Sequence, residues 1–124
     1  MQYLSDAWFA AADEALRSAG PAPVELVIDQ HVAGAESWRI VIGPECSIHR
    51  LTDLTDPLAR PDAAFHQSIE VARAIARGDA DAHQAILLGD VRFEGDIACV
   101  VDGRNGLEWL GDVLAPIMDR IVWN

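Results

Sequence analysis

The sequence contains few cysteines and none of the spacings that organise a zinc ribbon or a disulfide framework. Cys46 and Cys99 are its only cysteines, and no CxxC pair occurs. Small proteins stapled by disulfides or zinc carry more cysteines at shorter spacing. We therefore expect two buried, reduced thiols, and a fold that rests on its hydrophobic core.

The sequence also lacks a hydrophobic run long enough to cross a bilayer. Its longest apolar runs, such as 24–28 and 86–88, are short or carry a charge, whereas a membrane-spanning helix needs ~20 apolar residues. The first residues show no secretory signal, and the early acidic residues Asp6, Asp13 and Glu14 argue against a transit peptide. We therefore expect a soluble, cytoplasmic protein that is not embedded in a membrane.

Positive charge is scarce. Nine basic residues against 20 acidic ones give a formal net charge of -11, which repels nucleic-acid phosphates and anionic lipid headgroups. We therefore expect no nucleic-acid partner. The acidity itself is typical of a protein kept in solution by its charge.

Catalytic and cofactor motifs are missing as well. No GxGxxG, GxxxxGK[ST] or GxSxG pattern occurs, and none of the four histidines falls in an HExxH or HxH pair. Asp53 and Asp56 lie in a loop rich in Thr, Asp and Pro, where such residues form turns and caps. We expect no catalytic residue, cofactor or metal. Convergence of His31, His49 and His66 across neighbouring strands remains an alternative.

What the chain does contain is enough apolar material for one core. Its 124 residues are 51% hydrophobic, which fits a single domain over residues 1–124. Apolar residues at three- and four-residue spacing predict an amphipathic helix over 3–19. Ser5 is positioned to cap its start, and Gly20 followed by Pro21 is positioned to end it.

Strand patterns follow this helix. Segments 24–32, 37–43 and 46–51 are separated by short turns, so we expect antiparallel neighbours. In the second segment Trp38 and Ile40 alternate with Ser37 and Arg39, which predicts one apolar face.

The second half alternates strands and helices. A strand over 62–67 leads to a helix that Ser68 caps and Gly78 ends. Further elements are a short helix from a capping box at Asp81 to Gly89, a strand over 90–94, and a brief helix capped by Asp96 that ends at Gly103. The order of elements predicts an α+β protein built in layers.

A long final helix is predicted from a capping box at Asn105 and Glu108 toward Val122, with Pro116 bending or splitting it. Its apolar positions cover a face wider than a contact between two layers requires. Such a helix either seals a cavity or combines a conventional core contact with a dimer surface.

The chain resembles a small bacterial member of the sterol carrier protein 2-like family, and residues 62–96 carry this likeness. The likeness lies in a strand, a helix ending near a glycine, a second helix containing Gln84 and Ala85, and a glycine-bounded strand. The matching positions of that last block are Gly89, Val91, Arg92, Phe93, Gly95 and Asp96. Asp90 stands where the family commonly has a basic residue, which weakens the expectation of a basic rim for anionic headgroups.

The resemblance implies a five-stranded, mostly antiparallel sheet covered by helices, with an apolar tunnel between the sheet and the later helices. It implies a lining from Phe65, Ile86, Leu87, Val91, Phe93, Ile97, Val100 and Val101, with Leu110, Leu114 and Ile117 of the last helix as the lid. Strand alternation adds Trp38 and Ile40 to this ligand-binding set. His66 and Arg92 are candidates to orient a ligand at the mouth.

Three hypotheses follow. The first is noncatalytic binding of a hydrophobic small molecule or lipid, such as a fatty acyl chain or a sterol. The second is a protein-interaction or accessory subunit that uses its apolar helix surface, including a homodimer. The third is a small cofactor-free enzyme with His66 or Asp90 at the tunnel mouth.

Overall fold

The first helix forms where the apolar spacing and its caps predict it. The computed structural model describes residues 1–53, 60–102 and 104–123, and helix α1 spans Asp6–Ser18. The Ser5 hydroxyl oxygen accepts a hydrogen bond from the Trp8 amide at 3.2 Å, as an N-cap does. Gly20 beyond the helix end adopts φ 83°. The helix begins later than predicted because Leu4, at φ 61°, turns the chain just before it.

Five strands form one sheet. They are β1 (Leu26–Ala33), β2 (Trp38–Ile42), β3 (Ser47–Arg50), β4 (Ala63–Ser68) and β5 (Arg92–Gly95), in the order β3-β2-β1-β4-β5. The pairs β1–β2, β2–β3 and β4–β5 are antiparallel, and β1 and β4 run parallel. The predicted mostly antiparallel sheet and the α+β class are confirmed. A 3-10 turn, η1 (Leu51–Asp53), follows β3.

Predicted caps are confirmed at both ends of α2 and at the start of α4. Helix α2 (Ile69–Arg77) is capped by Ser68 and ends at Gly78, which adopts the left-handed conformation. Helix α3 (Ala82–Leu88) ends before Gly89 at φ 83°. Helix α4 (Ile97–Asp102) starts after Asp96, whose carboxylate accepts a hydrogen bond from the Ala98 amide at 2.9 Å.

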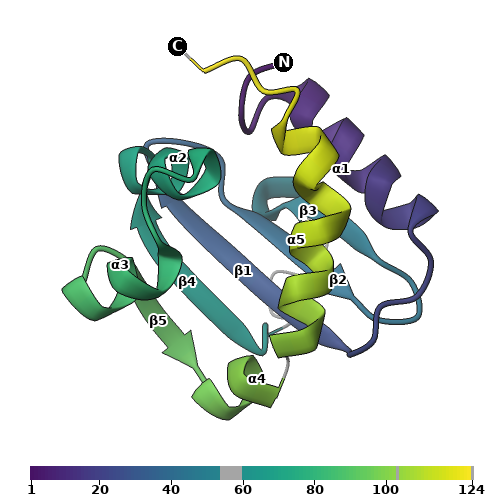
Figure 1. Ribbon diagram of the computed structural model, residues 1–124. Helices are drawn as coiled ribbons and strands as arrows, with labels where there is room; N and C mark the ends of the chain where they lie inside the picture. Colours follow the sequence, from purple (N-terminus) through teal and green to yellow (C-terminus); the bar gives the residue numbers. More distant parts are fainter. Residues whose placement is uncertain (54–59, 103, 124) are drawn as a thin grey trace.

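The last helix differs from its prediction at both ends. Helix α5 spans Arg104–Met118, so Asn105 lies inside its first turn and is not the N-cap. The helix runs through Pro116 without splitting, although this proline lacks the N–H that would donate to the carbonyl of residue 112, and it ends two residues later. It stops before Val122 because the Val122 amide donates to the Met1 carbonyl at 2.7 Å. The two chain ends therefore pair with each other (Figure 1).

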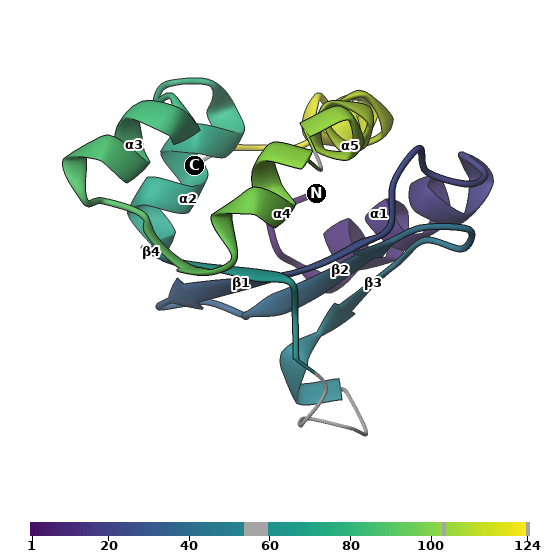
Figure 2. The ribbon, with the colours of Figure 1, turned by 90° about the horizontal axis from the view of Figure 1, so that it is seen from below.

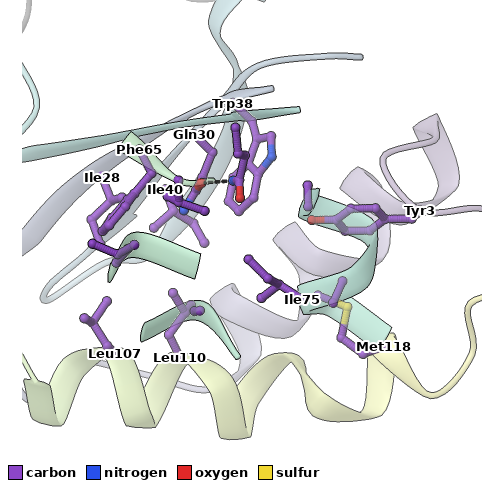
Figure 3. A pocket seen from close by; sticks show the side chains of 16 residues that line it. Tyr3, Ile28, Gln30, Trp38, Ile40, Phe65, Ile75, Leu107, Leu110 and Met118 are labelled. Carbon is purple, nitrogen blue, oxygen red and sulfur yellow. Dashed lines mark hydrogen bonds between the residues drawn. The ribbon is translucent and has the colours of Figure 1, made fainter. Parts of the chain in front are cut away.

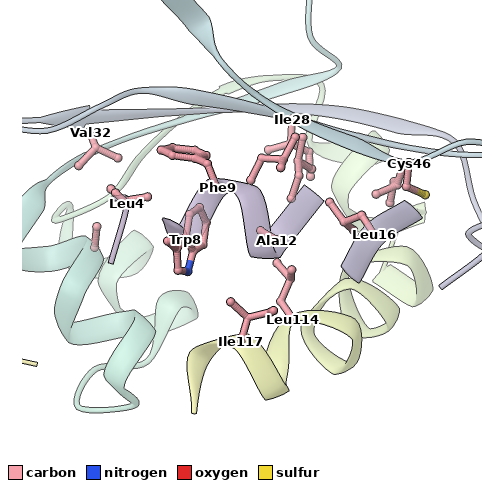
Figure 4. Packing of buried hydrophobic residues seen from close by; sticks show 14 of the residues in the cluster. Leu4, Trp8, Phe9, Ala12, Leu16, Ile28, Val32, Cys46, Leu114 and Ile117 are labelled. Atoms are coloured by element: carbon pink, nitrogen blue, oxygen red, sulfur yellow. The ribbon is translucent and has the colours of Figure 1, made fainter. Parts of the chain in front are cut away.

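Helices α1 to α5 all lie on the same face of the sheet (Figure 2). Helix α1 packs on β3 and against α5, while α2 and α4 pack on β4. The hydrophobic core fills the space between α1, α5 and strands β1 to β3. Trp8 and Leu16 of α1 and Ile40 of β2 are at most 1% exposed. Figure 4 shows Leu114 and Ile117 of α5 pointing toward α1 in this core.

The helix-free face of the sheet holds a buried ion pair. Arg39 on β2 donates to both carboxylate oxygens of Asp29 on β1, at 2.6 and 3.0 Å. The two residues are directly paired in the β1–β2 register, and they are 8% and 4% exposed. This pair is the reason that charged residues occupy buried positions on two central strands.

Cys46 is buried and unbonded to another cysteine, while the side chain of Cys99 lies outside the described residues. None of the helices within the described ranges combines the length and hydrophobicity that a bilayer crossing requires.

The close approach of α5 to the sheet depends on Gly106. A Cβ atom there would lie 2.2 Å from Val24 Cγ2 and 3.0 Å from Ile42 Cδ1, whereas one at Gly111 would have nothing within 4 Å. We expect Gly106→Ala to destabilise the protein by about 1–3 kcal/mol through overpacking. The control Gly111→Ala gains up to about 1 kcal/mol of helix propensity. Urea unfolding measures both, and equal effects of the two variants would contradict the close contact.

The Asp29–Arg39 pair gives a second prediction. Asp29→Ala leaves the Arg39 guanidinium buried without its counter-charge, so we expect a loss of about 3–5 kcal/mol in the free energy of unfolding. The control is Glu108→Ala, which breaks the pair between Arg104 and Glu108, whose side chains are 81% and 65% exposed. We expect that change to cost no more than about 0.5 kcal/mol. Similar losses for both would show that the central pair is not buried.

Candidate functional site

A cavity of about 290 Å³ lies between the sheet and helices α2, α3 and α5. Its volume is at the lower end of the ~300–1,000 Å³ range of small-molecule sites. Strands β1, β2 and β4 form one wall, and the helices form the other (Figure 3). The lining residues are Tyr3, Ile28, Gln30, Trp38, Ile40, Phe65, Gln67, Ala72, Ile75, Ala76, Ala82, Ile86, Val91, Leu107, Leu110 and Met118.

The sheet wall comes from alternate strand positions. Side chains two residues apart share one face of a strand, so each of the three strands contributes a pair of lining residues. The register places Ile28 opposite Ile40, and Gln30 between Trp38 on β2 and Phe65 on β4. Phe65 in turn contacts the Phe93 ring edge to face, with centroids 5.5 Å apart.

The helix wall combines small and branched side chains. Ala72, Ile75 and Ala76 lie on one face of α2, at the three- and four-residue spacing of a helix. Helix α5 contributes Leu107 and Leu110 from the side facing the sheet wall (Figure 3). The alanines leave space that larger residues would fill, and this keeps the cavity open.

Two glutamines are the main polar groups of the lining. Gln67 Nε2 on β4 donates to Gln30 Oε1 on β1 at 2.7 Å (Figure 3). Gln30 and Gln67 are both half-buried. The indole N–H of Trp38 is buried and finds no hydrogen-bond acceptor within the described residues. Of the described residues that line the cavity, none carries a formal charge.

Tyr3 closes the cavity beside the N-terminal turn, and its phenolic oxygen points inward (Figure 3). Its ring contacts Trp8 at a centroid distance of 5.2 Å, and Trp8 contacts Trp38 at 5.7 Å. Burial raises the pKa of Tyr3 to about 12 because an apolar environment disfavours the phenolate. The phenol is therefore neutral across the physiological range.

Comparison with known proteins identifies the fold. No protein-family model and no curated protein matches the sequence. Among solved structures, a crystal structure of sterol carrier protein 2 superimposes with a TM-score of 0.62 at 13% identity, covering 98% of this chain and 100% of that one. The chain has the sterol carrier protein 2 fold.

Two further structures with this fold agree. A conserved hypothetical protein of Thermus thermophilus, described as possibly a sterol carrier protein, gives a TM-score of 0.63 at 14% identity, with 94% of this chain and 90% of that one covered. Palmitated SCP2L2 of Aedes aegypti gives 0.54 at 18% identity over 100% of both chains.

Within this fold, the cavity collects six of the predicted ligand-binding residues: Trp38, Ile40, Phe65, Ile86, Val91 and Leu110. Phe93 is paired with Phe65 across β4 and β5 and contacts its ring, but it is absent from the lining. The side chains of Ile97 and Val100 lie outside the described residues. Whether the six residues bind a ligand stays a prediction.

Four predicted residues lie elsewhere. Leu87 and Val101 are 74% and 66% exposed, because α3 and α4 turn these positions away from the sheet. Leu114 and Ile117 are buried against α1 and do not line the cavity (Figure 4). The wide apolar face of α5 therefore serves two neighbours: α1 on one side and the cavity on the other.

The polar candidates for the mouth also need correction. His66 alternates with Phe65 and Gln67 on β4, and therefore points to the helix-free face. There its ring stacks on that of His31 with centroids 4.5 Å apart, and its Nε2 lies 3.3 Å from a Glu94 carboxylate oxygen. Arg92 lines the same outer groove. The sheet lies between this group and the cavity, although Gln67 near the end of β4 lines both hollows.

The described residues form neither the metal site nor the acid/base pair that the sequence suggested as alternatives. Within residues 1–53, 60–102 and 104–123, no three His, Cys, Asp or Glu side chains come together as metal ligands would. Asp53 lies 3.9 Å from an Arg50 nitrogen as an exposed ion pair. Its suggested partner, Asp56, lies outside the described residues.

Sequence reasoning missed ten lining residues, namely Tyr3, Ile28, Gln30, Gln67, Ala72, Ile75, Ala76, Ala82, Leu107 and Met118. A signal existed for some of them. Strand alternation from Phe65 reaches Gln67, and helical spacing from Ala72 reaches Ile75 and Ala76. Tyr3 had no such signal, because it precedes the first helix and reaches the cavity through the turn at Leu4, which no sequence period indicates.

Tyr3 gives a prediction at alkaline pH. Its folded-state pKa lies above the usual ~10 of an unfolded tyrosine, so the folded state retains the proton longer. Its stabilising effect is therefore complete below pH ~10 and is lost as pH rises toward ~12, by about 2–3 kcal/mol. Urea unfolding across that range measures the loss.

Tyrosinate absorbance reports this group alone, because Tyr3 is the only tyrosine. The control Tyr3→Phe removes the absorbance change and flattens that part of the stability profile. Titration of wild-type Tyr3 near its ordinary pKa would contradict the burial.

Proposed function

We propose that the protein binds and carries an apolar molecule in the cavity between the sheet and helices α2, α3 and α5. The observation that carries this proposal is the cavity of about 290 Å³, with apolar residues as most of its lining. The palmitated Aedes aegypti protein and the sterol carrier protein 2 structure, which share the fold, support a lipid as the guest.

The energetics favour such a guest. Each methylene transferred from water to the cavity contributes about 0.8 kcal/mol, so a chain of about eight carbons gains ~6 kcal/mol before the cost of its immobilisation. Ile86 on α3 lines the cavity and is 38% exposed, which supports entry of a chain beside this helix. Binding by this route needs no charged contact.

Carriage without a chemical step is part of the proposal. The enzyme hypothesis relies on His66 or Asp90 at the mouth of the cavity. His66 points to the opposite face of the sheet from the cavity, and Asp90 is an exposed residue just after α3. This placement does not favour a reaction on a molecule held inside.

A second candidate function, protein interaction, has one observation in its favour. Leu87 and Leu88 on α3 are 74% and 71% exposed. The predicted docking helix was α5, but α1 and the cavity cover much of its apolar face. An interaction surface of this protein would therefore centre on α3. Leu87→Asp would then lower the affinity for a partner and leave ligand binding in the cavity unchanged.

Cavity binding is tested with ω-bromododecanol, whose bromine quenches nearby tryptophan fluorescence. Trp38 lines the cavity, so we expect saturable quenching. Ala76→Phe fills part of the space, so less of the probe can be buried. Losing the burial of about two methylenes costs about 1.6 kcal/mol, which corresponds to at least ~10-fold weaker binding. The matched control is Ala115→Phe at an exposed position of α5, which should bind like wild type.

Native mass spectrometry of the purified protein provides an independent measurement, in which a co-purified apolar adduct supports carriage. Absence of both an adduct and saturable quenching would refute the proposed function. Equal binding by Ala76→Phe and wild type would place the ligand elsewhere.

A further inference from the structure

Among the described residues, the polar groups that line the cavity are all uncharged. Its described residues include two primary amides, a phenol and an indole, but no Arg, His, Asp or Glu. The basic side chains of β1, β2, β4 and β5, which are His31, His66, Arg39 and Arg92, belong to the other face of the sheet. The chain as a whole carries a net charge of -11.

This composition disfavours an anionic ligand. A carboxylate moved into an apolar site without a cationic partner loses its hydration and is driven to take up a proton. Tyr3 cannot supply a compensating charge, because a phenol is neutral at physiological pH and its ionised form is an anion. A fatty acid would therefore have to enter in its protonated form.

The glutamine pair favours a neutral polar group on the ligand. Gln30 and Gln67 hold each other through one hydrogen bond of 2.7 Å. A primary amide has two donor hydrogens and an acceptor oxygen, so the pair retains further donors and acceptors for a guest. These groups match a hydroxyl, which both donates and accepts, and a carbonyl, which accepts.

The position of the pair also points to recognition. The neighbouring residues on the same sheet wall, Ile28, Ile40 and Phe65, are all apolar. Apolar residues at positions 30 and 67 would therefore match the wall and would avoid the cost of burying two amides in it. Gln30 lies between Trp38 and Phe65 in the register. A hydrocarbon ligand lying along the apolar wall would therefore contact both amides at a single point.

We propose that the cavity selects an uncharged amphiphile, a hydrocarbon whose head is a hydroxyl or carbonyl group, and that Gln30 and Gln67 bind this head. The inference rests on the proposed function of the cavity and names the class of its ligand. It excludes the fatty-acid anion as the preferred guest.

The test compares two probes that differ only in the head group, ω-bromododecanol and ω-bromododecanoate, by quenching of tryptophan fluorescence. At pH 7 we expect the alcohol to bind at least ~10-fold more tightly. Between pH 7 and pH 5 the carboxylate should gain up to about tenfold in affinity per pH unit, because it binds with a proton. The alcohol should stay constant, and this controls for titration of the histidines on the other face.

Variants assign the effect to the glutamines. Gln30→Leu and Gln67→Leu should each weaken alcohol binding about 3- to 10-fold, the usual range for a lost neutral hydrogen bond. The control Gln84→Leu, at an exposed position of α3 outside the lining, should bind like wild type. Gln67→Arg should reverse the order and favour the carboxylate. Far-ultraviolet circular dichroism checks that each variant folds, and the wild-type pH series needs no variant.

The outcomes separate the two proposals. If neither probe binds, the cavity function fails and this inference fails with it. If the carboxylate binds wild type as tightly as the alcohol, with no pH dependence, the inference is refuted and carriage stands. Unchanged alcohol affinity in both leucine variants would likewise refute the role of the glutamines while carriage stands.

Discussion

The packing of α1 between β3 and α5 is the constraint on which the cavity depends. Trp8 and Leu16 of α1 are fully buried in the core, and Leu114 and Ile117 of α5 pack against this helix. Helix α5 is thus supported by α1 along its second half and approaches the sheet at Gly106 near its start. Helices α2 and α4 pack on β4, and α5 is held over the middle of the sheet by its contacts with α1 and at Gly106. The space that remains between α2 and α5 above the sheet becomes the cavity.

Because side chains alternate along each strand, the charged side chains of β1, β2 and β4 lie on one face of the sheet and the neutral cavity-lining side chains lie on the other. On β4, Phe65 and Gln67 face the cavity, and His66 between them faces outward. On the neighbouring strands, the Asp29–Arg39 pair is likewise kept on the helix-free side. Because a strand places successive side chains on opposite faces, the sheet acts as a partition. Charged groups remain outside, and the interior retains only neutral hydrogen-bonding groups.

Local signals in the sequence predicted the elements well, and three-dimensional contacts explain where they failed. Ser5, Ser68 and Gly78 act where caps were expected, since capping is a matter of a few adjacent residues. The apolar stripe of α5 could not show which neighbour each residue meets. Leu110 faces the cavity, whereas Leu114, one turn later, faces α1. Tyr3 reached the lining through a turn at a non-glycine residue with positive φ, which no pattern indicates.

The cavity also bears on the stability of the protein. An apolar space left unfilled costs stability, because its lining loses the packing contacts that larger side chains would supply. A typical domain is stable by only ~5–15 kcal/mol, so such losses are significant. A bound guest recovers part of that cost and shifts folding by mass action. Retaining Ala72 and Ala76, where larger apolar residues would fill the space, therefore lowers the stability of the empty protein. The proposed carriage of an apolar guest would account for that loss.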